Sequence, residues 1–193
     1  MKSHRHTGLG ELDPVELRRL VGLYHLEEYL FEKVSRRFVR DHTLTPYDFF
    51  AIVTWKSNRS KTKIKDGLLV TGKSVDELMR EVSQEGTLDA KVQRLLSIPG
   101  IGIPIASAIL AVCYPEQFTI LDRRVWETLK EASVEGLTPG FPQDAAGYLQ
   151  YCQACSHNAD KARLSLRDLD RALWAKNWEK DLRSMINESM NLR

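Results

Sequence analysis

The sequence predicts an all-α protein made of two helical lobes. Few segments alternate polar and apolar residues as a half-buried strand does, whereas many place apolar residues three and four positions apart. Residues that start and stop helices recur at the ends of these segments. The 193 residues are enough for one substantial core or for two small lobes that share it.

Proline and capping residues mark the helix boundaries in the first half of the chain. Asp13-Pro14 and Thr45-Pro46 each combine an N-cap residue with a proline in the first turn. Ser74, with Glu77 three residues later, forms a capping box. We therefore expect helices over about 14–40, 46–57, 75–85 and 88–97, and a short basic helix after Ser57-Asn58 that ends near Gly67 or Gly72.

The second half continues in the same helical pattern. After a short turn at 98–102, Pro104 lies where a first-turn proline is tolerated, at the start of an apolar helix. Small residues at 106–108 would let this helix approach a neighbour closely. Further helices are expected over about 123–132, 144–159 and 166–190, with a turn-rich loop at 136–142.

The composition indicates a soluble intracellular protein. An odd, sparse set of three cysteines fits a reducing compartment better than a secreted disulfide scaffold. No segment has the apolar core of a signal peptide, and no run approaches the ~20 apolar residues that span a bilayer. We therefore expect no membrane partner.

The charge distribution is informative locally rather than globally. A net charge of +2 gives no overall nucleic-acid signature. Between Thr54 and Lys65, however, the chain carries no acid and five basic residues: Lys56, Arg59, Lys61, Lys63 and Lys65. Such a run can contact phosphates, although a solvated helix face is the simpler explanation when it stands alone.

The segment Ile98-Pro99-Gly100-Ile101-Gly102 lies between two apolar helical runs. Two glycines separated by one residue let a turn bring its backbone close to a ligand. The amides of Gly100, Gly102 and Ile105 would then lie near the start of the next helix, where an anion is favoured. The segment predicts a phosphate site, and an ordinary helix–helix turn is the alternative.

This segment, together with Asp122 after a proline-containing turn, resembles the helix-hairpin-helix-GPD superfamily of DNA glycosylases, the endonuclease III-like base-excision enzymes. The resemblance is specific over 88–126, where the spacing needs no insertion, although the loop at Tyr114-Pro115 lacks a glycine. It is moderate over 45–60 and weak over 165–178. It implies a glycosylase-like fold with one lobe over 42–121, which carries the hairpin, and a second formed by 1–41 and 122–193.

Departures from the family pattern narrow the expected chemistry. Bifunctional members carry a lysine two positions after the second glycine, where this chain has Pro104, so lyase chemistry by that route is excluded. Lys56, which lies outside the turn at 98–102, is the remaining candidate for supplying such an amine. Only Cys152 and Cys155 lie near the C-terminus, so we expect no iron-sulphur cluster. Val53 replaces the glutamate of adenine-specific members, which argues against that substrate.

By resemblance, Asp122 would stabilise the oxocarbenium-like sugar of a flipped nucleotide and orient a water for attack at C1′. It could equally cap the helix that begins at Arg123, and both roles can coexist. Asn58 would fill the gap left by the flipped base, with Lys56 and Arg59 on phosphates or on the opposite strand. A helix C-cap with solvated neighbours is the alternative for Asn58.

Four tryptophans are candidates for lining a base pocket: Trp55, Trp126, Trp174 and Trp178. Most tryptophans at helical spacing are core residues, so we expect at most one of them in the pocket.

The sequence suggests two hypotheses for a metal site. In the family, hairpin carbonyls hold a monovalent cation such as Na or K, which by position implicates Leu96, Ile98 and Ile101. Cys152 and Cys155, with a nearby histidine, could be zinc ligands. A tetrahedral zinc site needs a fourth ligand, however, and none is spaced nearby, so we expect that these residues pack within a helix.

The expected function is that of a monofunctional DNA glycosylase of base excision repair, which acts as a monomer on double-stranded DNA. A non-catalytic DNA-binding module is the first alternative, because the span from Ser74 to Ile98 is short by about a helix pair relative to the family. A helical protein-interaction domain with a purely structural hairpin is the second alternative.

Overall fold

The computed structural model describes residues 14–191, and these fold into helices joined by turns, with no strand among them. The predicted all-α class is therefore confirmed. In chain order the elements are α1 (Pro14–Tyr24), α2 (Leu26–Glu28), the π-helical turn η1 (Tyr29–Val34), α3 (Ser35–Asp41), α4 (Pro46–Ser57), the 3-10 turn η2 (Asn58–Ser60), α5 (Lys61–Thr71), α6 (Val75–Gln84), α7 (Leu88–Leu96), α8 (Ile103–Cys113), α9 (Arg123–Glu131), α10 (Ala145–Ala162) and α11 (Leu166–Asn191).

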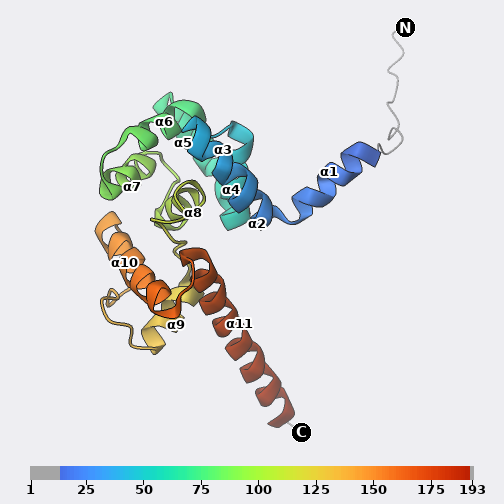
Figure 1. Cartoon of the computed structure of the whole chain (residues 1–193), viewed down its shortest axis with the longest axis vertical. Helices are drawn as coiled ribbons and strands as arrows, with labels where there is room; N and C mark the ends of the chain where they lie inside the picture. Colours follow the sequence, from blue (N-terminus) through green and yellow to red (C-terminus); the bar gives the residue numbers. More distant parts are fainter. Residues whose placement is uncertain (1–13, 192–193) are drawn as a thin grey trace.

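The helices form two groups on either side of α8. Figure 1 shows α2 to α7 gathered above α8 and α9 to α11 below it, with α1 pointing away from both groups. No helix in the described range 14–191 is both long and apolar enough to cross a membrane.

Local capping chemistry accounts for most of the helix starts. The Thr45 side chain accepts a hydrogen bond from the amide of Asp48, and the capping box of Ser74 and Glu77 is present in both directions. Gly72 ends α5 with a φ of 65°, a left-handed conformation that glycine adopts without steric cost. These predicted boundaries are confirmed.

The first predicted helix is interrupted. Instead of one helix over 14–40, the chain bends at His25, whose φ and ψ are −86° and 58°, and then passes through η1. No proline or glycine marks this bend in the sequence. As a result α1 leaves the helical groups, and its apolar residues Val21 and Tyr24 are 65% and 87% exposed.

The lobe boundaries also differ from those expected. Leu30, Val34 and Phe38 are at most 1% exposed, and their helical segment packs against α4 and α8. Residues 26–41 therefore belong with 42–121 and not with 122–191, because their apolar face meets α4 and α8. Residues 1–13 of the expected second lobe lie outside the described residues.

Helix α8 is the central element of the core. All of its residues except Pro104 are buried, and it packs against α3, α4 and α7. The small residues Ala106 and Ala108 are both buried within this packing. The turn before α8 and the segment after it are thus held by one buried helix.

Candidate functional site

A cleft of about 400 Å³ lies where α2, α4, α11 and the segment before α9 meet, a size typical of small-ligand sites. It is lined by Glu27, Trp55, Lys56, Ile120, Asp122, Arg167, Asp170, Arg171 and Trp174. Residues from four distant parts of the sequence therefore line one cleft.

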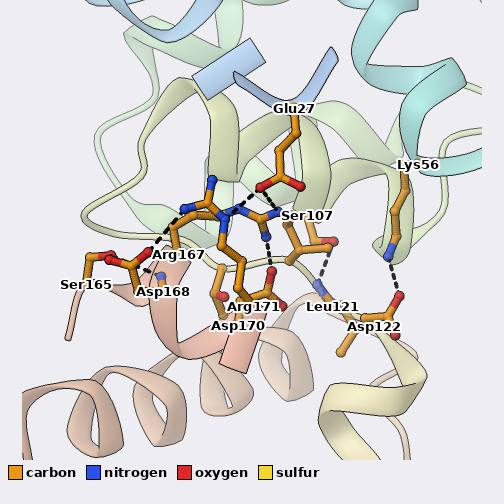
Figure 2. A network of polar contacts seen from close by, with 12 residues as sticks. Glu27, Lys56, Ser107, Leu121, Asp122, Ser165, Arg167, Asp168, Asp170 and Arg171 are labelled. Atoms are coloured by element: carbon orange, nitrogen blue, oxygen red, sulfur yellow. Dashed lines mark hydrogen bonds and ion pairs between the residues drawn. The ribbon is translucent and has the colours of Figure 1, made fainter. Parts of the chain in front are cut away.

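Asp122 lies on the edge of this cleft, at the N-cap of α9. One carboxylate oxygen, Oδ1, accepts a hydrogen bond from the amide of Arg124 at 3.0 Å. The other oxygen accepts from Nζ of Lys56, also at 3.0 Å, as Figure 2 shows. The side chains of Lys56 and Asp122 are 14% and 30% exposed. The expected cap role is confirmed, and the carboxylate still reaches solvent in the cleft.

Ser107 of α8 fixes the segment that leads to Asp122. Its hydroxyl oxygen accepts a hydrogen bond from the amide of Leu121 at 2.9 Å, and the hydroxyl donates to the carbonyl of Pro104 at 2.8 Å. This pair of bonds ties the residue before Asp122 to the first turn of α8. We expected only that residue 107 is small, and its hydroxyl proves to have a specific partner.

Two tyrosines of α10 hold the same segment from the other side. The hydroxyls of Tyr148 and Tyr151 donate to the carbonyls of Thr119 and Ile120 at 2.8 and 3.1 Å. Both tyrosines are fully buried, and burial raises the pKa of each phenol. Sequence reasoning missed them, although two tyrosines three positions apart share one face of a helix.

Ser107→Ala tests how far this support matters. The buried Leu121 amide would lose its acceptor, so the free energy of unfolding should fall by about 1–3 kcal/mol in urea titrations. Ser83→Ala, which removes an exposed hydroxyl that donates to the carbonyl of Arg80, should stay within about 0.5 kcal/mol of wild type. Equal losses in the two variants would show that the Leu121 bond contributes nothing specific.

A network of charged side chains forms one wall of the cleft. Figure 2 shows Glu27 of α2 facing α11, where its carboxylate accepts from Arg167 at 2.8 Å and from Arg171 at 2.7 Å. Burial opposes ionisation of Glu27, yet the bonds from the two arginines leave its pKa lowered. Arg167 also pairs with Asp170. Burial raises the pKa of Asp170 to about 6 even with this partner.

Asp170 should therefore make stability depend on pH. Its carboxyl has an ordinary pKa of 3.8, so between about pH 4 and 6 the folded state binds a proton more tightly than the unfolded state. The free energy of unfolding should fall by about 3 kcal/mol as pH rises through this window and then level off. In Asp170→Asn this component should vanish, while Glu27 still pairs with Arg167.

Urea titrations of both proteins from about pH 4 to 7.5 measure the difference between them, in which contributions from carboxylates remote from Asp170 cancel. Parallel curves for wild type and Asp170→Asn would contradict the raised pKa.

Aromatic side chains complete the cleft. Trp55 packs edge-to-face with Phe31, with ring centroids 5.8 Å apart, and the Arg167 guanidinium lies over both rings. Trp174 also lines the cleft and is 43% exposed. Two of the four candidate tryptophans thus line the cleft, where we expected at most one, and Trp178 does not line it. Trp126 does not, because it is 5% exposed and packs edge-on against Phe141, so its assignment to the base pocket is wrong.

The turn at 98–102 has some, but not all, of the backbone features expected of a phosphate site. Gly100 has a φ of 94°, and the Ile101 amide closes the turn on the carbonyl of Ile98 at 3.0 Å. In the described part of the chain, the amides of Gly100 and Gly102 have no recorded partner. The Ile105 amide, expected to be available to a phosphate, instead donates to the carbonyl of Gly102 at 3.0 Å because α8 has already begun.

Helix α5 packs directly against this turn. A Cβ built on Gly67 would lie 1.9 Å from the carbonyl oxygen of Pro99, and one built on Gly100 would lie 3.0 Å from the Lys63 backbone. The basic segment and the turn, separate in the sequence, therefore form one surface. Its exposed lysines are Lys61, Lys63 and Lys65.

Asn58 and Arg59 follow the last turn of α4 and are both exposed. The side-chain oxygen of Asn58 accepts from Nζ of Lys61 at 2.8 Å. Both side chains are accessible to a large partner in the described part of the chain.

The two groups of candidate metal ligands are the carbonyls in and next to the turn at 98–102 and the cysteines of α10. Of the three carbonyls that the resemblance implicates, those of Leu96, Ile98 and Ile101, the Ile98 carbonyl accepts from the Ile101 amide at 3.0 Å and keeps a second lone pair. Cys152 and Cys155 are buried in α10, and burial raises both thiol pKa values, that of Cys152 to about 11. Among residues 14–191 no group of three or more His, Cys, Asp or Glu side chains could hold a metal.

The chain matches no known family model, no curated protein and no solved structure.

Proposed function

We propose that this protein is a DNA glycosylase that hydrolyses the N-glycosidic bond of a damaged or mismatched base. The observation that carries the proposal is the position of the Asp122 carboxylate, on the edge of a cleft with tryptophans on its walls. The cleft has room for one base. A partly exposed carboxylate that lines the cleft would act on the sugar that remains outside.

The second support is the connection between this carboxylate and the turn at 98–102, which we take as a helix-hairpin-helix phosphate site. Hydrogen bonds through Ser107 tie Leu121 to Pro104 in the first turn of α8. A phosphate held by the amides of Gly100 and Gly102 would be favoured further by the α8 N-terminus and the nearby α5 lysines. DNA held there would run past Asp122.

In this mechanism the target nucleotide leaves the duplex at a cost of a few kcal/mol and its base enters the cleft between Trp55 and Trp174. Asn58 would occupy the vacated stack. As the glycosidic bond breaks, the base departs with the electron pair, and positive charge develops on the sugar beside Asp122. Water then attacks C1′ and gives its proton to the carboxylate.

A non-catalytic DNA-binding module remains the alternative, and one observation favours it. Both carboxylate oxygens of Asp122 already have partners in the protein, the Arg124 amide and Lys56. An acid placed only to cap α9 and to pair with a lysine would show the same contacts.

The deciding experiment is a panel of duplexes, each with one damaged or mismatched base, incubated with the protein and analysed with and without hot alkali. Glycosylase activity gives a break at the modified position of at least one duplex. Salt-dependent binding with no abasic product from any duplex would favour the binding module. Absence of binding at low salt would favour a protein-interaction domain.

A further inference from the structure

Lys56 is the one lysine among the described residues that line the cleft. The other cations on its walls, Arg167 and Arg171, carry guanidinium groups that stay protonated and are poor nucleophiles. A primary amine is different, because it can add to a carbonyl carbon. The chemistry open to this cleft therefore includes a covalent step at a single nitrogen.

The surroundings of Lys56 differ from those of a structural lysine. Lys91, which is buried in α7, donates to the carbonyls of Val82, Ser83 and Glu85 at 3.0, 3.4 and 2.7 Å, which uses all three of its donors. Nζ of Lys56 has one recorded acceptor, the Asp122 carboxylate. Lys56 is thus held in place at the end of α4 by a single group that can also accept its proton.

We propose that Lys56 gives this protein a second activity, the cleavage of DNA at abasic sites through an imine between its amine and C1′ of the sugar. This inference rests on the proposed function, which supplies the DNA and produces an abasic sugar next to Asp122. Pro104 excludes an amine from the turn at 98–102, but it has no bearing on an amine that α4 delivers from another wall.

The reaction balances with the two side chains present. The abasic sugar in its open form carries an aldehyde at C1′. Asp122 takes a proton from the Lys56 ammonium, and the nitrogen adds to C1′ and passes one of its two remaining protons to the former carbonyl oxygen. Asp122 then returns its proton to that oxygen, which leaves as water and gives a protonated imine.

The protonated imine then withdraws electrons from the neighbouring carbon. Asp122 removes a proton from C2′, that electron pair forms the C2′–C3′ double bond, and the 3′ phosphate leaves with the C3′–O pair. Water hydrolyses the imine and releases Lys56. No oxidant or reductant is consumed.

A duplex with one preformed abasic site tests this inference without knowledge of the excised base. In the presence of sodium borohydride, which reduces an imine to a stable amine, the wild type should form a covalent protein–DNA band on a denaturing gel. Without borohydride it should nick the strand. Lys56→Met should lose both products, while Lys176→Met, which removes an exposed amine on α11 that does not line the cleft, should behave as wild type.

Lys56→Arg keeps a positive charge next to Asp122, and it replaces Lys56→Met in the test if the methionine variant does not fold. It should bind abasic DNA with wild-type affinity and still give no covalent band. A wild-type protein that forms no band, or a band of equal strength in the Lys56 variants, would overturn the inference.

Failure of the inference and failure of the proposed function give different results. Base release revealed only by alkali, with no covalent band, would leave a monofunctional glycosylase and remove the role of Lys56. A covalent band on abasic DNA, with no base released from the duplex panel, would support Lys56 and remove the glycosylase.

Discussion

Asp122→Asn is expected to lower the rate of base release by at least about 100-fold, the loss typical when a group that stabilises transition-state charge is removed. The amide carries no negative charge to oppose the positive charge on the sugar, and it cannot accept a proton from water. Affinity for DNA should be unchanged or higher, because one negative charge near the phosphates disappears.

The substitution removes the negative charge without removing the helix cap, because asparagine caps helices about as well as aspartate. The side-chain oxygen of Asn can still accept from the Arg124 amide, so α9 should keep its start. Base release is measured on the duplex that the panel identifies, and binding by fluorescence anisotropy at the same salt concentration.

Asp144→Asn is the matched control for this experiment. Asp144 caps α10 by accepting from the Gly147 amide at 2.8 Å and does not line the cleft, so the same chemical change should leave base release at the wild-type rate. Equal rates for wild type and Asp122→Asn would end the enzyme proposal.

The sequence predicts those parts of the fold and site that depend on neighbours in the chain. The caps at Thr45, Ser74 and Asp122 join groups two or three residues apart, so composition and order suffice to predict them. The positive φ at Gly100 can also be expected from its neighbours, because two glycines separated by one residue indicate a tight turn.

Contacts between distant residues were not predictable in the same way. Lys56 and Asp122 are 66 positions apart, and Glu27 and Arg171 are 144 apart. Their pairing depends on how α4 and α11 pack, which no local pattern encodes. Trp126 and Trp174 have similar sequence surroundings, yet only packing places one in the core and the other on the cleft wall.

The bend at His25 is another feature that the sequence does not predict. It has no proline or glycine, and the apolar spacing runs through it, so the periodicity predicts a single helix. The bend brings Glu27 to Arg167 and Arg171 and so completes one wall of the cleft. Tertiary contacts outweigh helix periodicity here.

The close approach of α5 to the turn at 98–102 leads to a prediction in which two effects have opposite signs. Gly67 lies inside α5, where helix propensity alone makes alanine more stable than glycine by about 1 kcal/mol. A Cβ at this position, however, would lie 1.9 Å from the carbonyl oxygen of Pro99 and 2.9 Å from its carbon. Both are backbone atoms, which cannot rotate away as a side chain does.

We therefore expect Gly67→Ala to lower the free energy of unfolding by about 3 kcal/mol, at the upper end of the usual cost of overpacking. The turn can escape the clash only by moving away from α5, so the variant should also bind DNA more weakly at a temperature where it remains folded. Urea titration and anisotropy measure the two effects separately.

Gly22→Ala provides the comparison, because Gly22 also lies within a helix and a Cβ there meets no atom within 4 Å. Only propensity acts at that site, so stability should stay the same or rise slightly. A Gly67→Ala protein as stable as wild type would mean that α5 and the turn are not in contact. The shared surface for phosphates would then have no structural basis.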